Sequence, residues 1–208
     1  MKTAIFDVDG TLVNTHDGII HTIREVLEDL DLSYSGDYDL WIGPPVKKSF
    51  MEFCGLDENR ADEATHLYRK KYVEKYITES YLYPGMIVTM DELKNRGVRL
   101  AVATMKTKPQ VDKLFSYLGI ADYFDVIRTA RDDGSLSKAQ MVADIMGSND
   151  AYMIGDTNGD KEAAEKALCH FIGITYGFGF KPDEKYNFLK ADRPEDIVKI
   201  ILGGLHNV

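Results

Sequence analysis

The chain alternates between short runs of apolar residues and longer segments in which apolar residues recur every three or four positions. Four of the short runs are rich in β-branched or aromatic residues and predict buried β-strands at residues 2–8, 98–104, 151–155 and 170–175. The first run stops at Asp9-Gly10-Thr11, which predicts a tight loop directly after that strand.

Helices are expected between and after these strands, at residues 86–96, 109–118, 138–147 and 160–168. In the first three, a glycine stands at the end of the apolar pattern, as is common at a helix C-terminus. Strands that alternate with helices of this length indicate a mostly parallel sheet with helices on both faces. We therefore predict an α/β fold with three layers and a Rossmann-type core.

Residues 14–82 interrupt this alternation. Apolar positions at helical spacing predict one amphipathic helix at residues 19–30, and residues 59–81 predict a long charged helix. Glycine and proline mark a loop at residues 34–45, and Pro84-Gly85 marks the return to the α/β pattern. The predicted organisation is an α/β core made of residues 1–13 and 83–208, with a small helical domain inserted at residues 14–82.

Composition narrows the classes of function. The chain is 44% hydrophobic and 28% charged, which is typical of a globular protein. Its formal net charge of −9 and its two short basic runs give no basic face, so we expect no nucleic-acid partner. No apolar run is long enough to span a membrane, and two cysteines are too few for a disulfide framework. The expectation is a cytoplasmic protein, a monomer or a weak homodimer, that binds no membrane.

Two carboxylates, Asp7 and Asp9, follow the first predicted strand with one residue between them. Alternate residues of a strand point the same way, so both side chains could face one site. Carboxylates that close favour uptake of a proton or of a cation. One could attack phosphorus, the other could transfer protons, and Gly10 would let the backbone approach an anion. An ordinary Asp- and Gly-rich turn is the alternative.

Further polar residues follow the later strands, and ligands bind beyond the carboxyl ends of parallel strands. A hydroxyl at Thr104 could hold a phosphate oxygen, although a structural threonine is the more common case. Asp156 and Asp160 lie in a glycine-containing loop, and carboxylate oxygens suit Mg²⁺. Asp160 could equally cap the following helix. Lys138 is a candidate for the positive side chain that a phosphate among carboxylates needs.

These residues, in this order, resemble the four motifs of the haloacid dehalogenase-like (HAD) superfamily, in its phosphoglycolate phosphatase-like branch. The resemblance implies a magnesium-dependent phosphatase in which Asp7 is the nucleophile and a metal ligand. It also implies that Asp9 is the general acid–base and binds the metal through its backbone carbonyl, and that Asp156 completes the metal site with support from Asp160. Under the same resemblance, the phosphoryl group would be held by Gly10, Thr104, the backbone N–H of Met105, and Lys138.

The match has departures. Met105 stands where the family commonly has Asn or Ser, and the residues after Lys138 differ from the usual context, which makes Lys106 a substitute candidate. The inserted segment resembles the cap domain of this branch, with a substrate-facing loop at residues 43–45. Pro44 and Lys47, or Lys48 in its place, would then contact the substrate.

The expected reaction is hydrolysis of a small phosphomonoester, such as a phosphoglycolate-like compound, a nucleotide or a sugar phosphate, through an aspartyl-phosphate intermediate. Three alternatives stay open from the sequence. A phosphomutase of the same superfamily would share Asp7 and Asp9. A dehalogenase would need neither Asp9 nor a metal. A non-catalytic phosphate-binding module would keep the site without turnover.

Overall fold

A computed structural model describes residues 1–131, 135–148 and 150–203. In these residues six parallel strands form one sheet in the order β5-β4-β1-β6-β7-β8. Their bounds are β1 (Lys2–Phe6), β4 (Arg99–Thr107), β5 (Val126–Ala130), β6 (Asp150–Gly155), β7 (His170–Ile174) and β8 (Leu189–Ala191). The predicted α/β class with a mostly parallel sheet is confirmed.

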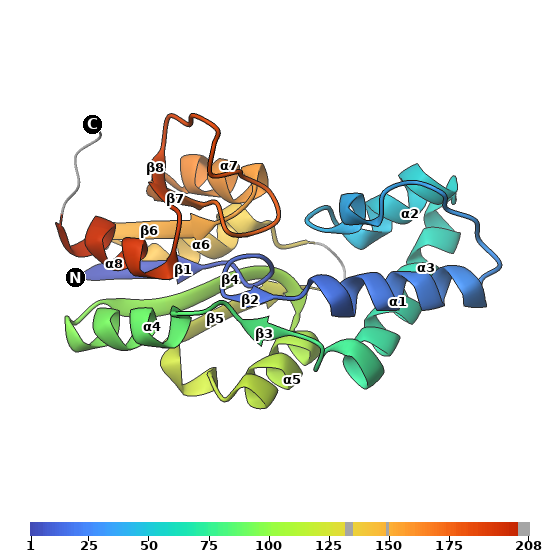
Figure 1. Cartoon of the computed structure of the whole chain (residues 1–208), viewed down its shortest axis with the longest axis horizontal. Helices are drawn as coiled ribbons and strands as arrows, with labels where there is room; N and C mark the ends of the chain where they lie inside the picture. The colour runs from blue at the N-terminus through green and yellow to red at the C-terminus, as the bar shows by residue number, and fades with distance from the viewer. Residues whose placement is uncertain (132–134, 149, 204–208) are drawn as a thin grey trace.

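Helices cover both faces of this sheet, so the core has three layers (Figure 1). The bounds are α4 (Met86–Asn95), α5 (Lys108–Leu118), α6 (Lys138–Met146), α7 (Asn158–Ala167), α8 (Pro194–Gly203) and the short η3 (Ala121–Tyr123). Side chains of each central strand alternate between the two faces. Phe6 packs with α4, α5 and α8 in one apolar cluster, and its neighbour Ile5 packs with α6 and α7 in a second cluster.

The inserted segment lies to one side of the core, beyond the carboxyl ends of the strands (Figure 1). It contains α1 (His16–Asp29), η1 (Tyr38–Trp41), α2 (Val46–Cys54), α3 (Glu58–Lys71) and the π-helical turn η2 (Tyr72–Tyr76). Two short antiparallel strands, β2 (Val13–Asn14) and β3 (Tyr81–Leu82), pair where the chain leaves and re-enters the core. We call residues 15–80 the cap. The domain boundaries stay a prediction.

Three details of the cap and the sheet differ from the predicted elements. The long helix predicted at residues 59–81 ends earlier, because η2 widens the helix and Ile77 donates its N–H to the carbonyl of Tyr72 at 2.8 Å. Helix α2 was not expected, since its nine residues give too short a periodic pattern. Strands β5 and β8 were also missed, because a charged residue interrupts each short apolar run.

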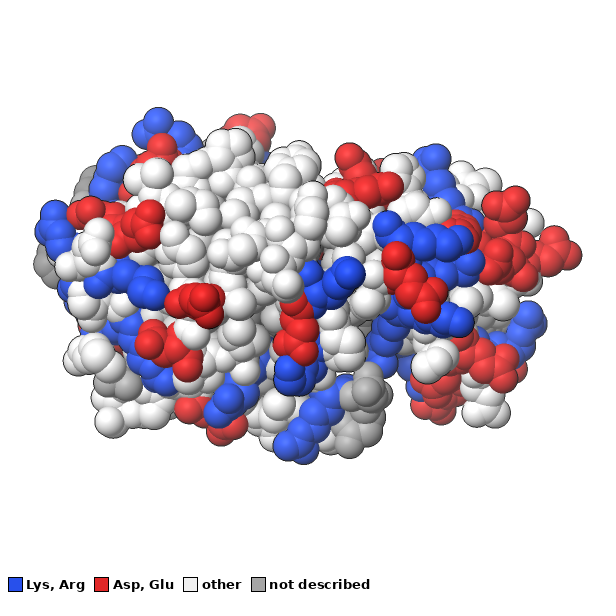
Figure 2. All heavy atoms as spheres, turned by 90° about the horizontal axis from the view of Figure 1, so that it is seen from below, with Lys and Arg blue, Asp and Glu red and all other residues white. Residues whose placement is uncertain are grey.

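The surface of the cap carries closely mixed charges, whereas the neighbouring face of the core shows a wider uncharged area (Figure 2). Several of the charges in the cap form ion pairs, such as Lys71 with Glu25 at 2.6 Å and with Asp29 at 2.8 Å. In the part of the chain that the structure describes, no helix has both the length and the apolar character needed to cross a bilayer.

Candidate active site

A compact loop after β1 positions Asp7 and Asp9. The Asp7 N–H donates to the carbonyl of Ile154 on β6 at 2.9 Å, which ties the end of β1 to the neighbouring strand. The carbonyl of Val8 accepts hydrogen bonds from the N–H groups of residues 11–13, at 3.3, 3.1 and 3.0 Å. Because Val8 is fully buried, the loop anchors itself in the core while the two carboxylates stand at the edge of the sheet.

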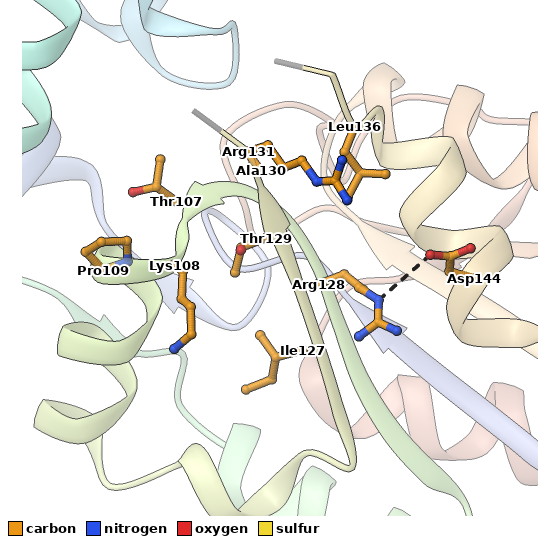
Figure 3. Close-up of a pocket in the computed structure, with 10 residues that line it drawn as sticks. All are labelled: Thr107, Lys108, Pro109, Ile127, Arg128, Thr129, Ala130, Arg131, Leu136 and Asp144. Atoms are coloured by element: carbon orange, nitrogen blue, oxygen red, sulfur yellow. Dashed lines mark ion pairs between the residues drawn. The ribbon is translucent and has the colours of Figure 1, made fainter. Parts of the chain in front are cut away.

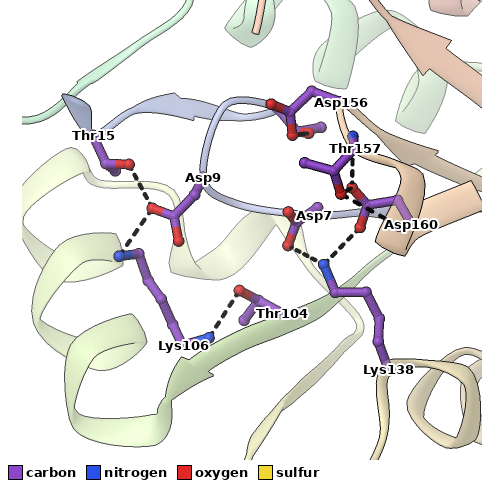
Figure 4. A network of polar contacts seen from close by, with 10 residues as sticks. Asp7, Asp9, Thr15, Thr104, Lys106, Lys138, Asp156, Thr157 and Asp160 are labelled. Atoms are coloured by element: carbon purple, nitrogen blue, oxygen red, sulfur yellow. Dashed lines mark hydrogen bonds and ion pairs between the residues drawn. The ribbon is translucent and has the colours of Figure 1, made fainter. Parts of the chain in front are cut away.

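Three elements bring carboxylates to this edge. Ligand oxygens of Asp7, Asp156 and Asp160 all lie within 4.8 Å of one another, and the three residues are buried. Asp7 follows β1, Asp156 follows β6, and Asp160 lies in the first turn of α7 (Figure 4). We call these three residues the acidic cluster. The structure thus brings together the carboxylates that the sequence placed after two different strands.

Lys138 lies against this cluster from the start of α6. Its Nζ donates to Asp160 Oδ1 at 2.6 Å and pairs with Asp7 Oδ1 at 2.9 Å. The other oxygen of Asp160 accepts from the N–H and the hydroxyl of Thr157, at 3.1 and 2.6 Å, in a capping box that begins α7. Asp160 therefore caps its helix, which is one of the roles considered from the sequence, and it also holds the lysine beside Asp7. Its support of a metal site stays a prediction.

Asp156 is held by a loop that the sequence analysis did not identify. The N–H groups of Phe178 and Gly179 donate to Asp156 Oδ2 at 2.8 and 3.3 Å, and the Thr11 hydroxyl donates to Oδ1 at 3.4 Å. The available signal was Gly177-Phe178-Gly179, which follows the fourth predicted strand at the same edge of the sheet. Glycines there let the backbone come close to Asp156 and Gly10.

Burial governs the protonation of the acidic cluster. Burial and the neighbouring carboxylates raise the pKa of Asp7 to about 7, although Lys138 opposes the shift. Burial and Asp160 raise the pKa of Asp156 to about 6, against the two N–H donors and Lys138. Burial opposes the charge of Lys138, but Asp160 and Asp7 hold its pKa above the ordinary value. Lys138 brings one positive charge to three carboxylates. The excess negative charge and the oxygen donors of the cluster fit a hard divalent cation such as Mg²⁺.

A second lysine stands beside Asp9. Lys106 Nζ lies 2.9 Å from Asp9 Oδ1, and the Thr15 hydroxyl donates to the same oxygen at 2.5 Å. The Thr104 hydroxyl, buried at the end of β4, accepts the N–H of Lys106 at 3.2 Å, and the side chain of Met105 is half exposed. Both lysines considered from the sequence therefore lie in the site, one beside each of the first two carboxylates (Figure 4).

The cap residues predicted to contact substrate lie in two different settings. The loop that contains Pro44 reaches the core, since a Cβ on Gly43 would lie 3.8 Å from the Thr157 side chain. Lys47 instead pairs with two carboxylates of α3, with Asp62 at 2.8 Å and Glu58 at 3.1 Å. The structure does not bring Lys47 to the acidic cluster in this arrangement. Contact of Pro44 or Lys47 with substrate stays a prediction.

A cavity of about 600 Å³ lies beside β5, the outermost strand on one side of the sheet, and it is lined as well by residues at the start of α5 and by residues before and in α6 (Figure 3). Lys108, Arg128 and Arg131 contribute cations to its lining, and Arg128 lies 4.0 Å from Asp144. Among the described residues that line it, none belongs to the acidic cluster. It is therefore separate from the carboxylates that make the candidate site.

Gly10 is required by this geometry, and replacing it gives a first prediction. Gly10 has φ +72°, and a Cβ there would overlap the Asp156 carboxylate and approach the Phe178 ring. We expect Gly10→Ala to lower the free energy of unfolding by about 1–3 kcal/mol and to weaken Mg²⁺ binding, because Asp156 must move. Urea unfolding and Mg²⁺ titration would measure the two effects.

Gly119→Ala is the matched control for this prediction. Gly119 ends α5 with φ +68° and has nothing within 4 Å of its ideal Cβ position. It therefore carries similar backbone strain without a neighbour to displace. Equal Mg²⁺ affinities in the two variants would contradict the role given to Gly10.

Comparisons with known proteins identify the family of this chain. The family model described as haloacid dehalogenase-like hydrolase matches residues 4–174. The phosphoglycolate phosphatase of Aquifex aeolicus is 28% identical over 209 residues, covering 97% of each chain. A solved structure described as a predicted phosphatase from Clostridium acetobutylicum superposes with a TM-score of 0.87 at 32% identity, covering 97% of this chain and 98% of the other.

A third relative has a different named activity. Tyrosine-protein kinase PtkA of Mycobacterium tuberculosis is 32% identical over 186 residues, which is 86% of this chain. The matched region spans only 63% of the length of PtkA.

The fold class and the family predicted from the motifs are confirmed by these matches. The predicted enzyme class, a phosphoric monoester hydrolase, agrees with the relatives named as phosphatases. The motif order, the acidic cluster and a family model that covers most of the sequence lead to one conclusion: the chain belongs to the haloacid dehalogenase-like hydrolase family.

Proposed function

We propose that this chain is a Mg²⁺-dependent phosphatase that hydrolyses a small phosphomonoester through an aspartyl phosphate formed on Asp7. The observation that carries the proposal is the setting of Asp7. Its carboxylate contacts the partly buried cation of Lys138 at 2.9 Å and lies among ligand oxygens that fit a divalent cation. A carboxylate so placed can attack phosphorus while nearby positive charge offsets that of the phosphate.

The roles proposed for the remaining residues are those implied by the family resemblance, and the positions of the residues support them. Asp7, Asp156 and the Asp9 backbone carbonyl would hold Mg²⁺, which supplies positive charge beside the phosphoryl oxygens. Asp160 would support the site by holding Lys138. The phosphoryl oxygens would be bound by Lys138, the Thr104 hydroxyl and the N–H groups of Gly10 and Met105.

Proton transfer falls to Asp9. As the bond between phosphorus and the leaving oxygen breaks and the bond to Asp7 forms, Asp9 gives its proton to the leaving oxygen and an alcohol departs. In the second step Asp9 takes a proton from water, whose oxygen attacks phosphorus. The bond to Asp7 then breaks, inorganic phosphate forms, and Asp7 and Asp9 return to their starting states.

The substrate would be a small metabolite enclosed between the core and the cap. A Cβ on Gly43 would lie 3.8 Å from the side chain of Thr157, the residue after Asp156. This contact supports the proposal that Pro44 and its neighbours would meet the leaving group. The named activity of the Aquifex aeolicus relative makes phosphoglycolate a first compound to test. A cytoplasmic location and a monomer or weak homodimer stay predictions.

A panel of small phosphate esters, assayed with Mg²⁺ for released inorganic phosphate, tests this function. We expect saturable release from at least one alkyl ester. Each alternative would give a different result in this panel or in a parallel assay with haloacids and EDTA. A mutase would yield an isomerised ester with little free phosphate, and a dehalogenase would release halide from a haloacid in EDTA. A binding module would retain esters without turnover.

A further inference from the structure

Lys106 lies in the seam between the core and the cap, where its cation touches both. Its side chain extends from the end of β4 and is 5% exposed. Its Nζ lies 2.9 Å from Asp9 Oδ1 in the core, donates to the Tyr72 hydroxyl of the cap at 3.2 Å, and lies 4.4 Å from the centre of the Tyr72 ring. One buried amine therefore connects a carboxylate of the site to the cap.

The cap holds Tyr72 firmly. Tyr72 is fully buried and begins the π-helical turn η2, and its ring stacks on that of Tyr68 with centroids 5.9 Å apart and planes 7° apart. Helix α1 packs closely on the same turn, because a Cβ on Gly18 would overlap the carbonyl of Tyr76. Single π-helical turns of this kind often occur at functional sites. Tyr72 is consequently expected to move together with the cap when the cap moves.

Both donors to Asp9 use the same oxygen. Thr15 and Lys106 each contact Oδ1, at 2.5 and 2.9 Å. Oδ2 accepts no hydrogen bond from the described residues (Figure 4). Two donors on one oxygen fix the plane of a carboxyl group that would otherwise rotate. They leave Oδ2 as the oxygen able to carry a proton toward a substrate.

We propose that Lys106 is a positioning residue that couples the cap to proton transfer by Asp9. With the cap seated, Tyr72 holds Lys106, and Lys106 holds Asp9 Oδ1, so that Oδ2 presents its proton to the leaving oxygen. Lys106 keeps its own proton throughout. With the cap displaced, Lys106 loses its partner in the cap and Asp9 loses a fixed orientation. The inference rests on the acid role proposed above for Asp9.

The test uses the leaving group, because an alkoxide must be protonated as it departs and a nitrophenolate need not be. kcat/KM depends on the steps up to and including phosphoryl transfer to Asp7. It therefore reports the proton transfer to the leaving oxygen and not the later hydrolysis of the aspartyl phosphate. The enzyme is assayed with Mg²⁺ on p-nitrophenyl phosphate and on the alkyl phosphate that the panel turns over fastest. The variants are Lys106→Met, Lys106→Arg and Tyr72→Phe.

We expect Lys106→Met to lower kcat/KM for the alkyl ester by about 100-fold, within the range of general acid catalysis, and for the nitrophenyl ester by less than about 3-fold. Tyr72→Phe should show the same selectivity with a smaller loss, and Lys106→Arg should recover part of the activity on the alkyl ester. Lys108→Met is the matched control, because Lys108 is exposed, pairs with Asp112 and should leave both esters unchanged.

Equal losses on both esters would overturn the inference, since Lys106 would then bind the phosphoryl group or maintain the fold. No loss on either ester would overturn it as well. If Lys106→Met does not fold, the comparison rests on Tyr72→Phe, which removes only a hydroxyl. Asp9→Asn separates the two proposals. If Asp9→Asn loses more activity on the alkyl ester than on the nitrophenyl ester but the Lys106 and Tyr72 variants do not, only the inference about Lys106 is refuted. If Asp9→Asn loses equal activity on both esters, the acid role of Asp9 is refuted.

Discussion

Asp7→Asn is expected to lower kcat by at least about 10⁴-fold while the protein stays folded, because an amide cannot form the phosphoryl-enzyme bond. The side chains have nearly the same size. Asp7 is 7% exposed, and burial raises the pKa of its carboxyl to about 7, so a neutral amide suits the site. Lys138 keeps Asp160 as a partner at 2.6 Å. Phosphate release measures the rate, and thermal unfolding measures the fold.

Two further measurements sharpen this prediction. In the wild-type enzyme, acid quenching followed by hydroxylamine should trap an acyl phosphate, and the modified peptide should contain Asp7. Asp112→Asn is the matched control, since Asp112 lies on the surface of α5 beside Lys108 and should keep normal activity. Turnover by Asp7→Asn within about tenfold of wild type would remove Asp7 as the nucleophile, and with it the proposed mechanism.

Removing divalent cations with EDTA is expected to abolish turnover and to lower Tm, and the Tm difference should increase from pH 5 to pH 8. The reason is the raised pKa of two buried acids, about 7 for Asp7 and about 6 for Asp156, against an ordinary 3.8. In the metal-free protein both hold protons that the unfolded chain releases near pH 4. The stability they contribute is therefore fully present below about pH 4 and is lost progressively as the pH rises from there to about 6 for Asp156 and about 7 for Asp7.

Mg²⁺ should counter this loss, because it binds the carboxylates only after their protons leave. At a concentration about 100 times its Kd, a ligand of the folded state adds about 2.7 kcal/mol, or about 5–10 °C in Tm for a chain of this size. Calorimetry at pH 5 and pH 8, with Mg²⁺ or EDTA, checks the prediction.

Asp156→Asn provides the control, because it should remove most of the Mg²⁺-dependent shift in Tm without removing Lys138 or Asp7. Full activity in EDTA would instead favour metal-independent chemistry, such as that of a dehalogenase. A Tm shift of the same size at both pH values would contradict the protonation assigned to the acidic cluster.

The sequence predicted those helices and strands whose short pattern of apolar and polar residues is compatible with one kind of local structure. An apolar strand followed at once by Asp7 and Asp9 specifies a buried strand with carboxylates at its end, and β1 and its loop follow that pattern. Helices α4 and α5 agree with their predicted spans to within one residue because a glycine follows each apolar pattern.

Other features depend on contacts between distant segments, which one sequence does not display. The N–H groups of Phe178 and Gly179 bind Asp156 across 22 and 23 residues of chain. Lys106 meets Tyr72 only because the cap folds against the core. From sequence, Lys106 and Lys138 competed for one role, and the structure places each beside a different carboxylate. Their roles in catalysis stay predictions until the variants are measured.

The paired strands β2 and β3 have a consequence for how such an enzyme can change. Because Val13–Asn14 and Tyr81–Leu82 are paired side by side, the chain enters and leaves the cap at one place. A segment of different length could replace the cap if its two ends lay as close together as β2 and β3. Every strand of the parallel sheet would then stay in register. The segment that would set substrate preference can thus evolve independently of the core that would carry the phosphoryl chemistry, although both belong to one polypeptide.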